Sequence, residues 1–272
     1  MFVVRGTLNV GFITSTSNVV YTKTLSQGDI FLFPQGLLRF FYNTGDTTAE
    51  VFGVFNNQNP GLQITDYALF GNILPAEVVS KDFCVANLLL SQTPAGYQCK
   101  PAARVTANDF YLTGAIRPTT IQPFNISFVP AYGSYLPGIN GLQLAGVRIF
   151  LGVNGVVPLH SIPRANEIMF VVRGTLNVGF ITSTSNVVYT KTLSQGDIFL
   201  FPQGLLRFFY NAGDTTAEVF GVFNNQNPGL QITDYALFGN ILPAEVVSKV
   251  TYLSVADVKG LKRFFGPRTF GA

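Results

Sequence analysis

Short apolar runs alternate with turn-forming residues along the first part of the chain. The runs cover residues 2–4, 7–14, 19–25, 30–33, 37–42 and 51–55. Gly, Pro, Asn, Asp and Ser lie between them, for example in Pro34-Gln35-Gly36. Short strands separated by turns at this spacing are typical of antiparallel sandwiches and barrels. The pattern therefore predicts an all-β fold.

Helical signals are few. Leu74-Pro75-Ala76-Glu77 resembles a helix start, because Pro is favoured in the first turn of a helix. Ser254 and Asp257 resemble a capping box in which Asp takes the place of Glu or Gln. Val255, Val258 and Leu261 follow with helical spacing. We therefore expect short helices near the C-terminus.

Residues 1–81 recur at 169–249, and the two segments differ only at Thr44 and Ala212. We call them the N-terminal repeat and the C-terminal repeat. Ordinary repeat proteins carry atypical terminal repeats, so near-identity indicates a recent duplication or a fusion of neighbouring coding segments. The middle segment, 82–168, occurs once; its first part reads as an irregular extension, and strands are predicted at 142–151 and 156–160.

The middle segment can complete either repeat, because residues 1–168 are a circular permutant of residues 82–249. A short covalent connection leads from His160 through Glu167 into the C-terminal repeat. This connection favours a domain in which the middle segment completes the C-terminal repeat. We therefore expect residues 82–272 to form one complete domain. Residues 1–81 then form a truncated half that docks loosely, exchanges with a neighbouring molecule or stays partly disordered.

Composition excludes several classes of protein. With 47% apolar and 11% charged residues the chain is not of the disordered class. The net charge of +3 comes without runs of Lys or Arg, so no nucleic-acid partner is indicated. No apolar stretch is long enough for a membrane span, and no secretory leader follows Met1.

Two further features bear on the compartment. Cys84 and Cys99 would form a disulfide in an oxidising compartment, which stabilises a loop of this length by about 3 kcal/mol. In the cytosol they would stay reduced, and two buried unpaired thiols remain the alternative. Asn125-Ile126-Ser127 is a glycosylation sequon, with Asn125 as the acceptor if the chain is secreted.

Several long motifs in residues 82–272 resemble the germin-like proteins of the plant cupin superfamily, and the auxin-binding-protein-like branch most of all. They are DFCVA, PAGYQCK, PGINGL, FPQGLLRF, PGLQITDYALFGN and the box Gly196-x5-Pro202-x-Gly204-x2-Arg207-x3-Asn211. The resemblance implies a jelly-roll barrel (a double-stranded β-helix) with short C-terminal helices. It also implies an extracellular, apoplastic location and a homo-oligomer.

The resemblance further implies a manganese site built from a His-x-His-x4-Glu motif and one more His. His160 and Glu167 match the first His and the Glu, and we name them as a remnant metal site. Ile162 and Arg207 stand at the other two positions, and His160 is the only histidine in the chain. A guanidinium offers no lone pair and repels a divalent cation, so we expect manganese binding to be weak or absent.

A sharper hypothesis concerns the same positions. If Arg207 and Glu167 both face the barrel interior, they would pair bidentately at the former metal position. In the alternative, Arg207 turns outward and Glu167 is solvated at the barrel mouth. The sequence favours a non-catalytic structural, storage or binding protein with no assigned catalytic residues. A manganese-dependent oxalate oxidase or superoxide dismutase is one alternative, and an auxin-like small-molecule binder is another.

Overall fold

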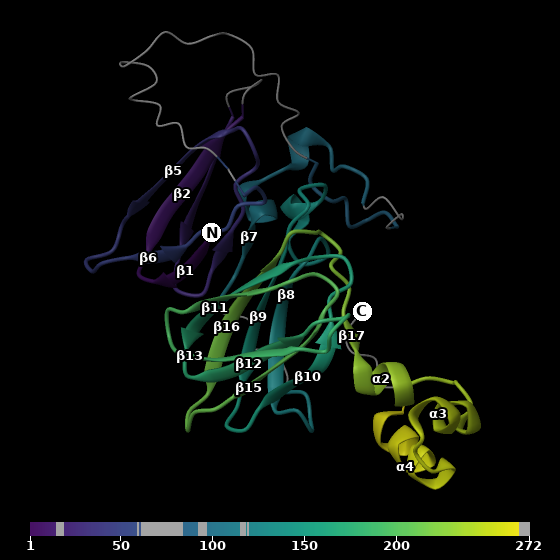
Figure 1. Cartoon of the computed structure of the whole chain (residues 1–272). Coiled ribbons are helices and arrows are strands. Elements are labelled where there is room, and N and C mark those ends of the chain that lie inside the picture. Colours follow the sequence, from purple (N-terminus) through teal and green to yellow (C-terminus); the bar gives the residue numbers. More distant parts are fainter. Residues whose placement is uncertain are drawn as a thin grey trace. The chain divides into compact units, whose positions relative to one another are not determined.

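The computed structural model describes residues 1–14, 19–58, 60, 84–91, 97–114, 118 and 120–266. Two compact units share the chain (Figure 1). The first unit contains residues 1–118, 129–148 and 222–227, and the second contains residues 119–128, 149–221 and 228–272. Residues 84–118 belong to the same unit as the N-terminal repeat. The domain boundary expected at residue 81 stays a prediction.

The first unit holds two small antiparallel sheets, one with the order β6-β1-β4-β7 and one with the order β3-β2-β5. Their strands are β1 (Phe2–Arg5), β2 (Leu8–Ile13), β3 (Val20–Leu25), β4 (Ile30–Phe31), β5 (Leu38–Asn43), β6 (Glu50–Phe52) and β7 (Tyr111–Leu112). Among the described residues of this unit, three 3-10 helices accompany them, η1 (Ala102–Arg104), η2 (Ala107–Phe110) and η3 (Pro137–Ile139). Phe12, Phe31 and Phe110 pack in its buried core. Residues 1–55 thus form strands close to the six predicted runs.

The second unit is built on two five-stranded sheets, ordered β13-β12-β15-β10-β17 and β14-β11-β16-β9-β8. Figure 1 shows these strands in teal and green. They are β8 (Ile126–Ala131), β9 (Ala145–Leu151), β10 (Val156–Ser161), β11 (Glu167–Arg173), β12 (Leu176–Ile181), β13 (Val188–Leu193), β14 (Ile198–Phe201), β15 (Leu206–Asn211), β16 (Ala217–Phe223) and β17 (Gln231–Ile232). Buried Met169, Leu176, Phe201, Phe209 and Val219 belong to the core. The unit boundary runs through β8, β9 and β16.

Three helices follow the sheets, α2 (Thr233–Phe238), α3 (Ala244–Thr251) and α4 (Val255–Phe265), drawn towards the yellow end in Figure 1. They bury a small core of their own around Val247 and Val258. The Ser254 hydroxyl accepts a bond from the Asp257 N–H, so the predicted cap of α4 is confirmed. The helix start expected at residues 74–77 lies outside the described residues. No helix that the structure describes is long and apolar enough to cross a membrane.

The two repeats form the same hairpins in the same register. Leu8 pairs with Asn43 in the N-terminal repeat, and Leu176 pairs with Asn211 in the C-terminal repeat. Their surroundings differ, because β10 pairs with β15 while β5 ends its sheet among the described strands. Phe209 is 1% exposed, whereas its counterpart Phe41 is 52% exposed. Hairpin geometry is therefore local, and burial depends on which segments the rest of the chain supplies.

Candidate functional site

An ion pair lies in the interior of the second unit. The Arg207 Nη1 atom lies 3.0 Å from Glu167 Oε2, and both side chains are almost fully buried. Arg207 belongs to β15, and Glu167 begins β11 in the other sheet of the unit. The pair expected from the sequence is thus formed across the two sheets, through one guanidinium nitrogen instead of two.

Other groups complete the surroundings of the guanidinium. Arg207 Nη2 donates to the Pro202 carbonyl at 2.9 Å, and the guanidinium carbon lies 5.2 Å from the centre of the Phe201 ring. That separation is within cation–π range. The Arg207 Nε atom has no hydrogen-bond partner in the described part of the chain. The guanidinium is held by a charge, a carbonyl and an aromatic face.

His160 lies in β10 directly opposite Arg207 in the strand register. It is buried, and its Nδ1 atom is 2.8 Å from the Pro158 carbonyl oxygen. Nδ1 therefore carries the proton and donates it, which leaves the lone pair on Nε2. Burial, with a smaller contribution from the charge of Arg207, lowers the pKa of His160 to about 4, although the hydrogen bond to Pro158 acts in the other direction. The imidazole is neutral at neutral pH.

The same buried environment shifts the pKa of Glu167. Burial raises the pKa of Glu167 to about 7, although the charge of Arg207 and its hydrogen bond pull in the other direction. Burial likewise lowers the pKa of Arg207, and Glu167 opposes that change. Removing charged groups from water is costly, and each partner compensates for part of the cost of the other.

These residues do not fit a divalent metal. The donors at the four family positions are one imidazole and one carboxylate. Ile162 is buried and supplies no donor atom, and Arg207 brings a cation to the carboxylate. Among the described residues, no group of three or more His, Cys, Asp or Glu side chains is placed to hold a metal ion.

The N-terminal repeat offers a natural comparison. Arg39 corresponds to Arg207 in an identical strand sequence, yet it is exposed, and its guanidinium carbon lies 5.7 Å and 5.4 Å from the ring centres of Phe33 and Phe55. The repeat contains no residue equivalent to Glu167, because Glu167 lies just before Met169, where the C-terminal repeat begins. An identical local sequence thus carries a buried, paired arginine in one repeat and an arginine without that carboxylate in the other.

Comparisons with known proteins agree with this architecture. The sequence matches the family Cupin over residues 1–88 and 113–259. It is 51% identical over 189 residues to germin-like protein 8-14 of Oryza sativa subsp. japonica, covering 69% of this chain and 88% of that protein. The chain is a germin-like member of the cupin family. It is also 46% identical over 187 residues to auxin-binding protein ABP19a of Prunus persica, covering 68% of this chain and 89% of that protein.

Solved structures add the fold of this germin-like cupin. An oxalate oxidase structure is 31% identical, with a TM-score of 0.64, and the match covers 68% of this chain and 95% of that one. A structure of oxalate decarboxylase from Bacillus subtilis is 15% identical, with a TM-score of 0.64 over 95% of this chain and 70% of its own. The second likeness concerns the fold alone. The jelly-roll barrel with short C-terminal helices is confirmed.

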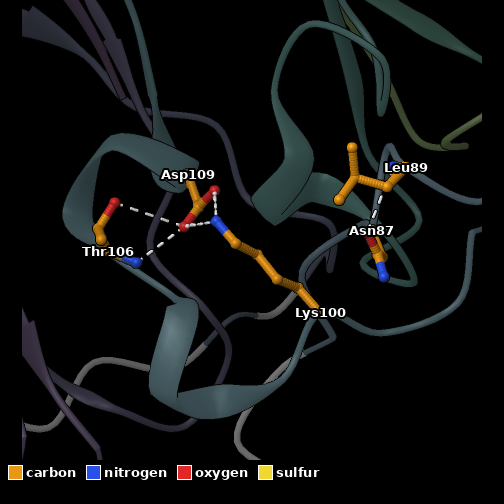
Figure 2. Close-up of polar contacts among 5 residues, drawn as sticks. All are labelled: Asn87, Leu89, Lys100, Thr106 and Asp109. Atoms are coloured by element: carbon orange, nitrogen blue, oxygen red, sulfur yellow. Dashed lines mark hydrogen bonds and ion pairs between the residues drawn. The ribbon is translucent and has the colours of Figure 1, made fainter.

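The segment before the barrel of the germin-like cupin contains the Cys84–Cys99 disulfide, with an S–S distance of 2.10 Å. Figure 2 shows the polar contacts that follow: Lys100 pairs with Asp109 at 2.8 Å, and Asp109 also accepts from the Thr106 N–H. A hollow of about 200 Å³ lies beside them, lined by Ala86, Asn87, Leu88, Leu89, Lys100, Pro101, Arg104, Asp109 and Pro137. The Lys100 ammonium facing it is already neutralised by Asp109.

The acceptor of the glycosylation sequon lies just before β8. Asn125 is half-buried with a φ of 50°, and its Nδ2 donates to the Val153 carbonyl at 3.0 Å. A glycosylated amide keeps one N–H, so this bond and a glycan are compatible. Glycosylation of Asn125 stays a prediction.

Sequence reasoning named Arg207, Glu167, Ile162 and His160 but missed the groups that orient them. The Pro158 carbonyl accepts a hydrogen bond from His160, and the Pro202 carbonyl accepts one from Arg207. No sequence pattern indicates which backbone carbonyls point into the interior. The Phe201 ring was traceable, since Phe201 immediately precedes the Pro of the second box.

Proposed function

We propose that this germin-like cupin has lost metal-dependent catalysis and acts as an extracellular structural, storage or binding protein. One observation carries the proposal: the Arg207 guanidinium pairs with Glu167 inside the unit, where the family resemblance expects imidazole and carboxylate ligands. A cation in this place neutralises the carboxylate and repels Mn²⁺. The apoplastic location and the homo-oligomer rest on the resemblance to germin-like proteins.

Metal analysis of the purified protein tests the proposal. The protein is incubated with Mn²⁺, desalted and assayed for bound metal beside the double variant Ile162→His, Arg207→His. We expect less than stoichiometric manganese in the wild type and about one manganese per chain in the variant, since four ligands are then restored. Stoichiometric manganese in the wild type, with oxalate oxidase or dismutase activity, would overturn the proposal.

A second candidate function is small-molecule binding. It is favoured by the 46% identity to a protein named auxin-binding protein ABP19a, with 89% of that protein covered. The test is calorimetry of the purified protein with an auxin such as indole-3-acetic acid. Saturable binding at one site per chain would support this candidate, and no heat of binding would remove it.

A further inference from the structure

Strand β5 of the N-terminal repeat has an open edge that its twin β15 lacks. Both strands have the sequence LRFFYN. β15 pairs with β12 on one side and with β10 on the other, whereas β5 pairs with β2 and ends its sheet among the described strands. The N-terminal repeat therefore presents the edge on which the C-terminal repeat holds a strand of the middle segment.

Three alternate side chains of β5 are uncovered at this edge. Arg39, Phe41 and Asn43 are exposed, while the equivalent side chains of β15 are all buried. The other three positions of the strand have the same burial in both repeats. Since the strand sequence and the pairing with the preceding hairpin strand are the same, the missing neighbour is what uncovers this face.

Asn43 keeps a donor for a neighbouring segment. In the C-terminal repeat, Asn211 Nδ2 donates to the Leu151 and Gly152 carbonyls of the middle segment, at 3.1 Å and 2.9 Å. Asn43 Nδ2 donates within its own repeat, to the Thr47 carbonyl at 2.7 Å. An amide nitrogen carries two hydrogens, so Asn43 can also donate to a carbonyl of an added chain.

Arg39 is set against the same aromatic ring as its twin but has no carboxylate. Its guanidinium carbon lies 5.7 Å from the ring centre of Phe33, and the equivalent separation of Arg207 and Phe201 is 5.2 Å. Arg207 is neutralised by Glu167, whereas no carboxylate of the described residues pairs with Arg39. The open edge thus combines an unpaired cation with an exposed aromatic surface.

We propose that the β5 edge binds an extended peptide of a partner protein, with a carboxylate side chain opposite Arg39 and apolar side chains beside Phe41. Peptides add to open sheet edges through backbone hydrogen bonds, and alternate side chains give the specificity. Opposite charges placed directly across an antiparallel pair strengthen it, up to about fivefold in affinity. The site does not include the Arg207–Glu167 pair, so it is independent of the metal chemistry proposed above.

The strand that covers β15 supplies the probe. β10 lies on β15 with His160 directly opposite Arg207. In the same register on β5, a fluorescein-labelled peptide of residues 154–163 with the substitution His160→Glu places its carboxylate opposite Arg39. The same peptide with His160→Gln or His160→Lys is the matched control, because only the charge at that position changes.

Fluorescence anisotropy measures binding of the three peptides to the full-length protein. The His160→Glu peptide should bind saturably at one site per chain, about three- to fivefold more tightly than the His160→Gln peptide. The His160→Lys peptide should bind most weakly, because like charges directly opposite each other repel. Arg39→Gln in the protein should abolish the preference for the His160→Glu peptide, which assigns that preference to the Arg39 charge.

A second protein variant shows which edge the peptide occupies. Phe41→Thr keeps a strand-forming residue and removes the exposed ring, while the identical sequence around Phe209 stays unchanged. Because Phe41 is 52% exposed, this change should leave folding intact and weaken binding of all three peptides by about fivefold or more. Binding that is unaffected by Phe41→Thr would place the peptide on β15 and overturn the proposal.

Other results would overturn the proposal as well. One is the absence of saturable binding, and another is a His160→Glu peptide that binds no more tightly than the His160→Gln peptide. Light scattering adds a third, because a wild-type oligomer that Phe41→Thr dissociates would assign the edge to a second copy of the chain. An oligomeric state that is the same in both proteins, together with charge-dependent peptide binding, supports the partner peptide.

Discussion

Replacing Arg207 by Ala tests the central interaction of the barrel. The substitution removes the 3.0 Å contact to Glu167 and the 2.9 Å bond to the Pro202 carbonyl, and it leaves a carboxyl group that is 3% exposed. Breaking a buried pair by deleting one partner costs about 3–5 kcal/mol. We expect the free energy of unfolding of the second unit to fall by that amount at pH 8.

The chain supplies its own control. Arg39→Ala makes the same change in an identical strand sequence, but Arg39 is exposed and has the rings of Phe33 and Phe55 nearby in place of a carboxylate. Exposed substitutions of this kind usually change stability by less than about 0.5 kcal/mol. The difference between the two variants therefore isolates the effect of burial and of Glu167.

The loss should also depend on pH. Without Arg207 only burial acts on Glu167, so its pKa rises above the value of about 7 that it has beside Arg207. At pH 5 the buried Glu167 carboxyl of the variant is neutral, so it costs the folded state little. At pH 8 the unfolded chain carries a charged carboxylate, and burying it without Arg207 destabilises the folded state. The destabilisation should therefore be larger at pH 8 than at pH 5.

Urea unfolding followed by circular dichroism at both pH values measures these effects. The buried ion pair would be refuted if Arg207→Ala and Arg39→Ala lowered the free energy of unfolding equally and by less than about 1 kcal/mol. A loss that is equal at pH 5 and pH 8 would refute the assignment of that loss to a charged, unpaired Glu167.

Three further predictions concern other parts of the molecule. His160 has an ordinary pKa of 6.5 that burial lowers to about 4, so the unfolded state binds more protons between these values and stability falls as pH falls through them. The control is His160→Gln, which removes the imidazole and leaves the opposite pH effect of Glu167 in place. Relative to this variant, the free energy of unfolding of the wild type should fall by about 3 kcal/mol between pH 6.5 and pH 4. Parallel curves of unfolding free energy against pH for the two proteins would contradict the prediction. Replacing Cys84 and Cys99 by Ser should destabilise the first unit by about 3 kcal/mol, because the disulfide joins residues that are 15 positions apart. Thermal unfolding measures the loss, and an unchanged melting temperature would argue against it. Residues 82–272 expressed alone should fold as one domain. A fragment that stays unfolded by circular dichroism would count against this.

Much of the fold was predictable because its determinants are local. The strand runs, the capped helix α4 and the germin-like motifs all depend on neighbouring residues, and the structure bears them out. The pairing of Arg207 with Glu167 was one of two alternatives left by aligning two motifs on the barrel of a known family, and the structure shows the paired one. The single-nitrogen contact and the Pro202 carbonyl did not follow, because they depend on the path of the backbone between Phe201 and Arg207.

The two repeats separate what the sequence determines from what the tertiary structure decides. The sequence alone determined the hairpins and their register, since turn residues and alternating apolar positions act over a few residues and gave the same result twice. It could not determine burial: Arg39 is exposed and Arg207 is buried, while Ile30 is covered and Ile198 is open. The physical reason is that β4 and β14 are identical strands that share a single β7, and β5 and β15 are identical strands that share a single β10. Only the tertiary structure decides that β7 lies on the N-terminal repeat and β10 on the C-terminal repeat.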